Sequence, residues 1–204
     1  MPATMNTTVY RFEELSPKAQ QQAIDDARYD DVDDDEFWTE FIREDWREKL
    51  EACGLSAIDF EYGVGHCQSD GAGFVARVDL AQWMKSQKLA AHHRALYNAS
   101  ADLGGAETSA YAAIARDSNV RRDYGGWPEI HIASYGTLDD EGCVRLDAQA
   151  EDVQAIMREW YRQQCRAFYR ELSEEQLALT SDEYIREKLT NSLDEWYTER
   201  GKRW

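Results

Sequence analysis

The chain has 204 residues, which is long enough to bury a sizeable core without disulfides or a structural metal. Hydrophobic residues make up 43% and aromatic residues 12%, which excludes an intrinsically disordered chain. The formal charge is −17, from 40 acidic and 23 basic residues, so the surface repels phosphates on average and we expect no direct binding of nucleic acid.

The start "MPATMNTTVYRF" has neither a basic nor an apolar stretch, so we expect no signal peptide. No apolar segment approaches the ~20 residues that cross a bilayer. The four cysteines form no C-x-x-C pair, which argues against a zinc ribbon or a disulfide framework. We therefore expect a soluble protein of a reducing cytoplasm, without membrane contact.

The first elements are a strand and two helices. Alternation from Val9 to Phe12 predicts the strand. Ser16 as N-cap and Pro17 at the first helical position predict a helix with an apolar stripe of small residues. A second helix follows the acidic run 25–36 and ends at Gly54. Its predicted buried face recurs at three- and four-residue steps: Trp38, Phe41, Ile42, Trp46, Leu50 and Cys53.

The middle of the chain predicts two hairpins separated by helices. "AIDFEYG" and "GFVARVDL" alternate apolar and polar residues around the loop 65–74. A helix is predicted from Leu80 to about Ala99, and the Ala-rich "AETSAYAAIAR" predicts another. "PEIHIASYG" and "CVRLDA" predict the second hairpin.

Two helices are expected at the end of the chain. The first is long, with an aromatic stripe from Val153 to Leu172 that core packing explains. A capping box at Thr180–Glu183 begins the second, whose inward face we expect to hold Ile185, Leu189, Leu193 and Trp196.

Strands that come in hairpin pairs favour an antiparallel sheet covered by helices. We predict a single α+β domain over residues 1–204, with about four to five strands in a small sheet and about five to six helices. Its helical part 16–53 is strongly acidic: residues 1–51 hold 15 acidic and 6 basic residues.

The loop "GHCQSDGAGF", residues 65–74, has two interpretations. In one it is only a turn, in which Gly71 and Gly73 supply positive φ. In the other, glycines expose backbone N–H groups to a small polar ligand, which would be bound by Gln68, Ser69, Asp70 and Gly71.

A second candidate ligand segment combines arginines, glycines and aromatic residues that could stack on and clamp a nucleotide. The alternative is an ordinary surface loop. The residues concerned are Arg121, Arg122, Trp127, His131 and Tyr135.

Catalytic and metal-binding signals are weak. His66 and Cys67 would point to opposite faces of an extended chain, so the best acid–base combination is Asp70 with His66 and His131. No spacing matches a common metal motif. We predict no catalytic residue, no metal and no cofactor.

The acidic run from 25 to 36 holds eight acidic residues and one basic residue. It is either a solvated surface or a partner-binding surface whose carboxylates mimic the phosphates of a nucleic acid. In the second interpretation the contacts are made by Asp30, Asp31, Asp33, Asp34, Asp35 and Glu36.

Four stretches, in order, resemble a largely uncharacterised family of phage and prophage proteins that are sometimes labelled antitoxin-like. They are "YRFEELSPKAQQQA" (10–23), "CQSDGAGF" (67–74), "REWYRQ" (158–163) and "LTSDEYIRE" (179–187). The second is similar to the family's S-Q-G-D-G-A-x-F loop. The resemblance implies an accessory protein that acts inside a bacterial host cell.

These observations lead to one main functional hypothesis. The chain is expected to be a non-enzymatic inhibitor of a bacterial anti-phage defence component. It would bind a host protein through its acidic surface or sequester a nucleotide signal. The alternatives are an antitoxin that neutralises a cognate toxin and a metal-dependent phosphoesterase-type enzyme. Seven tryptophans also leave enough apolar surface for a homodimer.

Overall fold

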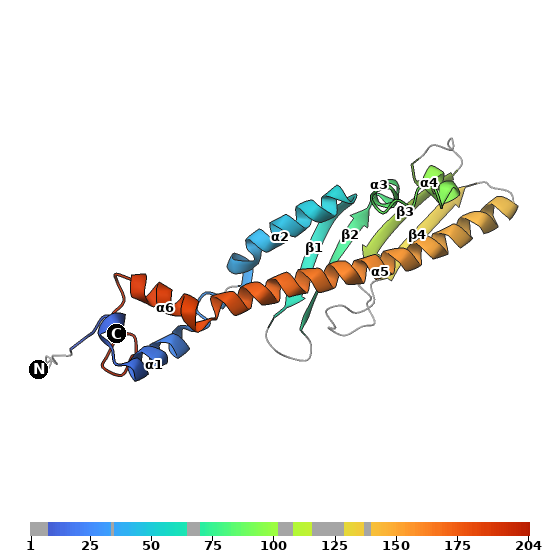
Figure 1. Cartoon of the computed structure of the whole chain (residues 1–204). Coiled ribbons are helices and arrows are strands. Elements are labelled where there is room, and N and C mark those ends of the chain that lie inside the picture. The colour runs from blue at the N-terminus through green and yellow to red at the C-terminus, as the bar shows by residue number, and fades with distance from the viewer. Residues whose placement is uncertain (1–7, 34, 65–69, 102–107, 116–128, 137–139) are drawn as a thin grey trace, which may run out of the picture. The chain divides into compact units, whose positions relative to one another are not determined.

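The computed structural model describes residues 8–33, 35–64, 70–101, 108–115, 129–136 and 140–204, and the fold is α+β, as predicted (Figure 1). The described residues form six α-helices, one short 3-10 helix and four strands. The chain divides into two compact units. The terminal unit comprises residues 1–40 and 173–204, and the sheet unit comprises residues 41–172. Helices α2 (Asp35–Ala52) and α5 (Asp140–Leu179) have residues in both.

The terminal unit is assembled from both ends of the chain. Its elements include the 3-10 helix η1 (Phe12–Glu14), α1 (Pro17–Ala27) and α6 (Asp182–Asn191). Their apolar faces share one core, which consists of Phe12, Leu15, Ala19, Ala23, Ile24, Ala27, Ile185, Leu189 and Tyr197. The caps follow the sequence closely: the Ser16 hydroxyl accepts a hydrogen bond from the N–H of Ala19, and Pro17 is the first helical residue, as predicted.

The predicted strand at Val9–Phe12 is wrong. Tyr10 makes an isolated bridge to Tyr197, and η1 begins at Phe12. The carboxylate of Glu14 accepts a hydrogen bond from the N–H of Arg11 at 2.7 Å, which stabilises a helical turn where the alternation predicted extended chain.

The helix start at residues 180–183 is displaced by one residue from its predicted position. Ser181, not Thr180, is the N-cap of α6, and its hydroxyl accepts from the N–H of Tyr184 at 3.2 Å. The hydroxyl of Thr180 instead donates to the carbonyl of Gln176. Ile185 and Leu189 are buried as predicted, but α6 ends at Asn191, so the expectation that Leu193 and Trp196 continue the inward face is wrong: both are exposed.

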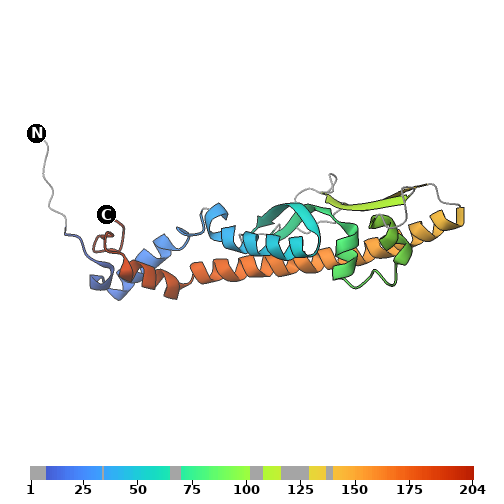
Figure 2. The same cartoon turned by 90° about the horizontal axis from the view of Figure 1, so that it is seen from above.

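The sheet unit contains one antiparallel sheet with strands in chain order: β1 (Leu55–Gly63), β2 (Gly71–Val78), β3 (Thr108–Ala115) and β4 (Glu129–Gly136). The predicted hairpin around residues 65–74 is confirmed, since β1 pairs with β2 from Leu55↔Val78 to Gly63↔Gly71. The unit's helices are α2, α3 (Leu80–Ser86), α4 (Arg94–Ser100) and α5. They lie on the same side of the sheet (Figure 2).

Three predictions for this unit are wrong. The Ala-rich stretch predicted as a helix is β3, because pairing with β2 on one side and β4 on the other overrides the helix propensity of alanine. "CVRLDA" is not a strand but the beginning of α5, where Leu146, Ala150 and Val153 are buried on one face. The helix predicted over 80–99 is interrupted, and Lys88 adopts a positive φ of 61° between α3 and α4.

Aromatic side chains connect α5 to the first two strands. The ring of Phe168 lies 5.0 Å from Phe60 and 5.6 Å from Trp46, measured between centroids. The ring of Phe74 lies 4.8 Å from Tyr161, whose hydroxyl accepts a hydrogen bond from the N–H of Phe74. The stripe on α5 is therefore core packing, as the sequence indicated.

The buried ring of Phe168 gives a direct test of this core. We expect Phe168→Ala to lower the free energy of unfolding by about 3–5 kcal/mol, because it removes a fully buried aromatic ring and leaves a cavity. Urea denaturation followed by tryptophan fluorescence measures the change. Leu177→Ala, which truncates an exposed side chain of the same helix, is the control and should change stability by less than about 0.5 kcal/mol. Equal losses in the two variants would contradict the proposed core.

Candidate functional site

The loop 65–74 is only partly described, and the described part is strand. Gln68 and Ser69 lie outside the described residues. Asp70 is half-buried and precedes β2. Gly71 and Gly73 pair with Gly63 and Glu61 in the β1–β2 ladder, so the expectation that they supply positive φ in a turn is wrong.

Gly73 has a packing role. A Cβ atom at Gly73 would lie 2.9 Å from the hydroxyl oxygen of Tyr161, which is closer than real Cβ contacts come. The missing side chain therefore leaves room for the hydroxyl that binds the N–H of Phe74. This glycine is explained by a close approach between β2 and α5.

Of the second candidate segment, Arg121, Arg122 and Trp127 lie outside the described residues. His131 and Tyr135 are placed on β4, where they pair with Ala113 and Ser109 of β3. Their side chains are also outside the described part of the structure.

The strand register separates Asp70 from His131. His131 pairs with Ala113, and Ala113 pairs with Arg77 of β2. Asp70 precedes Arg77 by seven residues, which at ~3.3 Å per strand residue is roughly 20 Å along the sheet. The two residues therefore cannot form the acid–base pair considered from the sequence, and Tyr135 lies still farther along β3 and β4 from Asp70.

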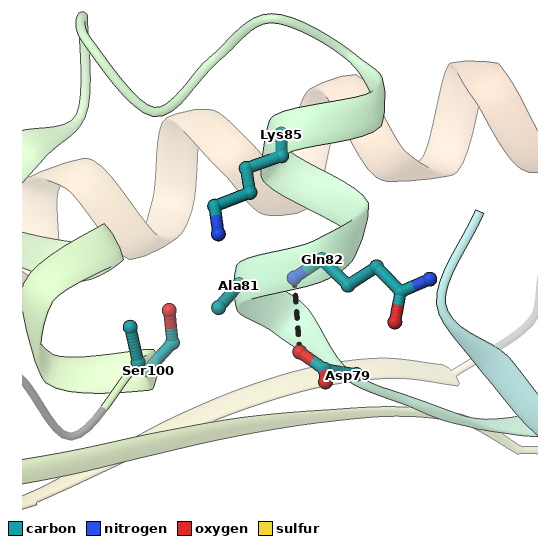
Figure 3. A pocket seen from close by; sticks show the side chains of 6 residues that line it. Asp79, Ala81, Gln82, Lys85 and Ser100 are labelled. Atoms are coloured by element: carbon teal, nitrogen blue, oxygen red, sulfur yellow. Dashed lines mark hydrogen bonds between the residues drawn. The ribbon is translucent and has the colours of Figure 1, made fainter. Parts of the chain in front are cut away.

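A shallow hollow of about 500 Å³ lies beside α3 and α4 and is open to solvent. Its lining includes Asp79, Gln82, Lys85 and Ser100, and Figure 3 shows Lys85 and Ser100 directed toward it. The carboxylate of Asp79 already accepts a hydrogen bond from the N–H of Gln82, as N-cap of α3. A hydrogen bond with Tyr97 raises the pKa of Lys85, and the charged amine is the one basic group among the described residues that line the hollow.

The acidic run lies in the terminal unit, where part of it is neutralised by basic residues from the C-terminal segment. Asp30 forms an ion pair with Arg203 at 2.6 Å. Asp31 forms one with Lys188 and accepts a hydrogen bond from the hydroxyl of Tyr184 at 3.1 Å. Asp30 and Asp31, proposed as partner contacts, therefore have internal partners. Asp34 and the side chains of Asp35 and Glu36 lie outside the described residues.

Arg28 is the centre of the same network. Its guanidinium contacts Asp25 at 2.9 Å and Asp182 at 2.5 Å, and it donates to the carbonyl of Thr180 at 2.7 Å. It thereby links the end of α1 to the beginning of α6. Hydrogen bonds from Arg28, with a smaller contribution from Gln21, lower the pKa of both carboxyl groups.

Sequence reasoning missed these counterions. Arg28 was visible as the single base within the run, but Lys188 and Arg203 are more than 150 residues away from the acids that they contact. The one available signal was the basic chain end "RGKRW". It could indicate a counterion for the acidic run but not which aspartate it meets.

The terminal unit remains strongly acidic despite these pairs. It holds 19 acidic and 8 basic residues, a net charge of −11 out of −17. Asp26, Tyr29 and Asp33 are exposed along the end of α1 and the following turn. Asp33 makes no ion pair within the described residues. Carboxylates and an aromatic ring are thus presented together.

The described residues give little support to metal binding or thiol chemistry. Among the residues that it covers, no group of three or more His, Cys, Asp or Glu side chains could hold a metal ion. Burial raises the pKa of the Cys165 thiol to about 12, so this thiol stays protonated. Within the same residues, no helix is both long and apolar enough to cross a membrane.

Comparisons with protein-family models, with curated proteins and with solved structures found no match.

The Arg28 network predicts a pH-dependent stability. The pKa values of Asp25 and Asp182 are lowered in the folded protein. Their ionised carboxylates therefore stabilise the fold fully at a pH above the ordinary pKa of 3.8, and this stabilisation is lost as the pH falls through the lowered pKa values. We expect Arg28→Gln to have a lower free energy of unfolding than the wild type near pH 7, and the difference to become smaller toward about pH 3. Urea denaturation of both proteins across this pH range measures the difference. Arg200→Gln is the control, and a pH-independent difference would exclude this role for Arg28.

A double-mutant cycle tests the ion pair between Asp31 and Lys188. Both side chains are about one-third exposed, so we expect a coupling of about 0.5–1 kcal/mol in the free energy of unfolding. The cycle compares Asp31→Ala, Lys188→Ala and the double variant by urea denaturation. Strictly additive losses would show that the pair contributes no stability.

Proposed function

We propose that the chain is a phage or prophage accessory protein that inhibits a component of bacterial anti-phage defence by binding to it. The binding is non-enzymatic and uses exposed carboxylates together with exposed aromatic rings. The target surface is basic, as expected for a protein that itself contacts nucleic acid.

The observation that carries this proposal is the charge of the terminal unit. A net charge of −11 is concentrated there although Arg28, Lys188 and Arg203 already pair with carboxylates. Such an excess costs stability through self-repulsion, and in return it accelerates association with a positive surface. The exposed ring of Tyr29 between the carboxylates adds a contact of the type enriched in protein interfaces.

Binding a protein is better supported than sequestering a nucleotide. The strand register keeps Asp70 far from His131 and Tyr135, so the two candidate ligand segments do not form one nucleotide site together. The hollow beside α3 offers one lysine and an occupied carboxylate, fewer charges than a nucleotide's phosphates usually meet.

The proposal predicts salt-sensitive capture of a host protein. We expect the purified chain, immobilised and exposed to a bacterial lysate, to retain a partner at about 0.1 M salt and to lose most of it at about 0.5 M. Mass spectrometry identifies the retained protein and any small molecule released with it. Steady turnover of a phosphoester substrate would contradict a non-enzymatic role, and a retained toxin would replace the defence component by the antitoxin alternative.

The surface itself is tested with Asp26→Asn/Asp33→Asn. These side chains are exposed and make no ion pair within the described residues, so their neutralisation should leave the fold intact. We expect affinity for the identified partner to fall about threefold to tenfold, mainly through slower association. Asp147→Asn/Asp152→Asn removes the same charge from exposed positions of α5 and is the matched control. Equal affinities of the two variants would locate the contact elsewhere.

A further inference from the structure

Residues 196–204 of the terminal unit form a tight hairpin. Tyr197 is paired with Arg203 in an antiparallel bridge. The N–H of Trp204 donates to the carbonyl of Trp196 at 2.8 Å. Trp196 and Trp204 therefore lie opposite each other on the two strands of the hairpin.

The inner face of this hairpin is fixed to the terminal unit. Tyr197 is buried, and its ring lies edge-on to Phe12 at 6.2 Å between centroids. Gly201 has a φ of 82°, and a Cβ atom there would lie 2.1 Å from the carbonyl oxygen of Ala19, so the turn packs directly against α1. The outer face is thus presented in a preorganised geometry, which lowers the entropy lost on binding.

Two indole rings occupy the outer face. Side chains alternate along a strand, so Trp196 and Trp204 point away from the side that buries Tyr197. Trp196 is 40% exposed and Trp204 is 72% exposed, and neither belongs to the core of the terminal unit. Tryptophan is among the residues most enriched in the energetic centres of protein interfaces. We call Trp196 and Trp204 the tryptophan face.

One ring of the tryptophan face already binds an arginine of the same unit. The guanidinium carbon of Arg11 lies 3.7 Å from the centroid of the Trp196 ring, which is a cation–π contact. The guanidinium also donates to the carbonyls of Leu193 and Glu195. Within the described residues, Trp204 makes no such contact with a cation, and its ring is the more exposed of the two.

The charge of the terminal unit favours a cation at this ring. The hairpin and its approach, residues 194–204, hold three acidic and three basic residues, so the net charge of −11 comes from the rest of the unit. That charge attracts a basic surface over a longer range, and the indole ring supplies the short-range contact. Arginine suits the ring better than lysine, because its planar guanidinium stacks on aromatic faces.

We propose that Trp204 binds an arginine side chain on the basic surface of the partner protein, as Trp196 binds Arg11. This inference rests on the proposed function and adds to it the contact residue of this chain and the chemistry of the group that it meets. A second copy of the chain is disfavoured, because it would bring two strongly negative units together. The phosphates of a nucleic acid would be repelled for the same reason.

A titration monitored by nuclear magnetic resonance tests the inference without a host protein. The full chain, carrying isotopically labelled tryptophan, is titrated with a capped peptide of alternating arginine and glycine. Trp196→Phe and Trp204→Phe assign the two indole N–H signals. We expect the Trp204 signal to shift more than that of the buried Trp83. The same peptide with neutral citrulline in place of arginine should cause little shift.

Substitutions separate a cation–π contact from general attraction to an acidic protein. We expect Trp204→Leu to weaken the affinity for the arginine peptide about twofold to fivefold. Trp204→Phe, which keeps an aromatic ring, should lose less. Leu177→Ala removes an exposed apolar side chain elsewhere in the unit and is the matched control, with unchanged affinity. Circular dichroism and urea denaturation confirm that each variant is folded.

Lys202 gives the sign of the charge that the face binds. It lies two residues from Trp204 on the same strand, so it is on the same side of the hairpin, and it is exposed. Lys202→Gln should therefore strengthen the binding of the arginine peptide. Once the host partner has been captured, the same variant should strengthen its binding as well. Weaker binding of the host partner by Lys202→Gln would indicate an anionic occupant and overturn the inference.

The two proposals fail in different ways. Equal affinities of the wild type and Trp204→Leu for the arginine peptide would overturn the inference, while salt-sensitive capture of a host protein would still support the proposed function. Equal affinities of these two proteins for the captured host protein would also overturn it. If the wild-type chain retains no host protein at any salt concentration, the proposed function fails, even where the peptide binds.

Discussion

The excess of carboxylates is the constraint on which the terminal unit depends. Nineteen acidic residues against eight basic ones would repel one another if the bases were dispersed in solvent. The structure instead places Arg28 between Asp25 and Asp182, with Lys188 on Asp31 and Arg203 on Asp30. These three basic residues thus lie where residues 25–31 meet the C-terminal segment, and acids such as Asp33, which makes no ion pair within the described residues, are left exposed. The same placement of acidic and basic residues therefore gives both the internal ion pairs and the negatively charged surface.

The sheet unit depends instead on the packing of large aromatic rings. Phe168 and Tyr161 of α5 contact β1 and β2, and Gly73 has no side chain because the hydroxyl of Tyr161 occupies that space. The aromatic face of α2 joins this core through Trp46. The ring of Phe41, on the same helix, is exposed.

The elements with strong local signals could be predicted from the sequence. Examples are the Ser16–Pro17 helix start, the end of α2 at Ala52, shortly before the positive-φ residue Gly54, and the hairpin of β1 and β2. Predictions failed where tertiary contacts decided the outcome. Alanines in β3 form a strand because they are paired on both sides, and Phe41 is exposed although it fits the apolar stripe that includes the buried Trp46 and Leu50. For the candidate site, the sequence indicated the acidic run but not its counterions, since no local pattern connects Asp31 with Lys188.

The bridge between Tyr10 and Tyr197 has a consequence for the order of folding during translation. The contacts of the sheet unit lie within residues 41–172, so they can form while the end of the chain is still being synthesised. Residues 8–33 have to wait, because their partners Asp182, Lys188 and Tyr197 are synthesised after residues 41–172. Before that, the apolar stripe of α1 lacks its contacts with Ile185, Leu189 and Tyr197, and Asp30 and Asp31 lack their basic partners. At that stage the excess of acidic residues in this segment favours repulsion between chains over association of the uncovered apolar stripes.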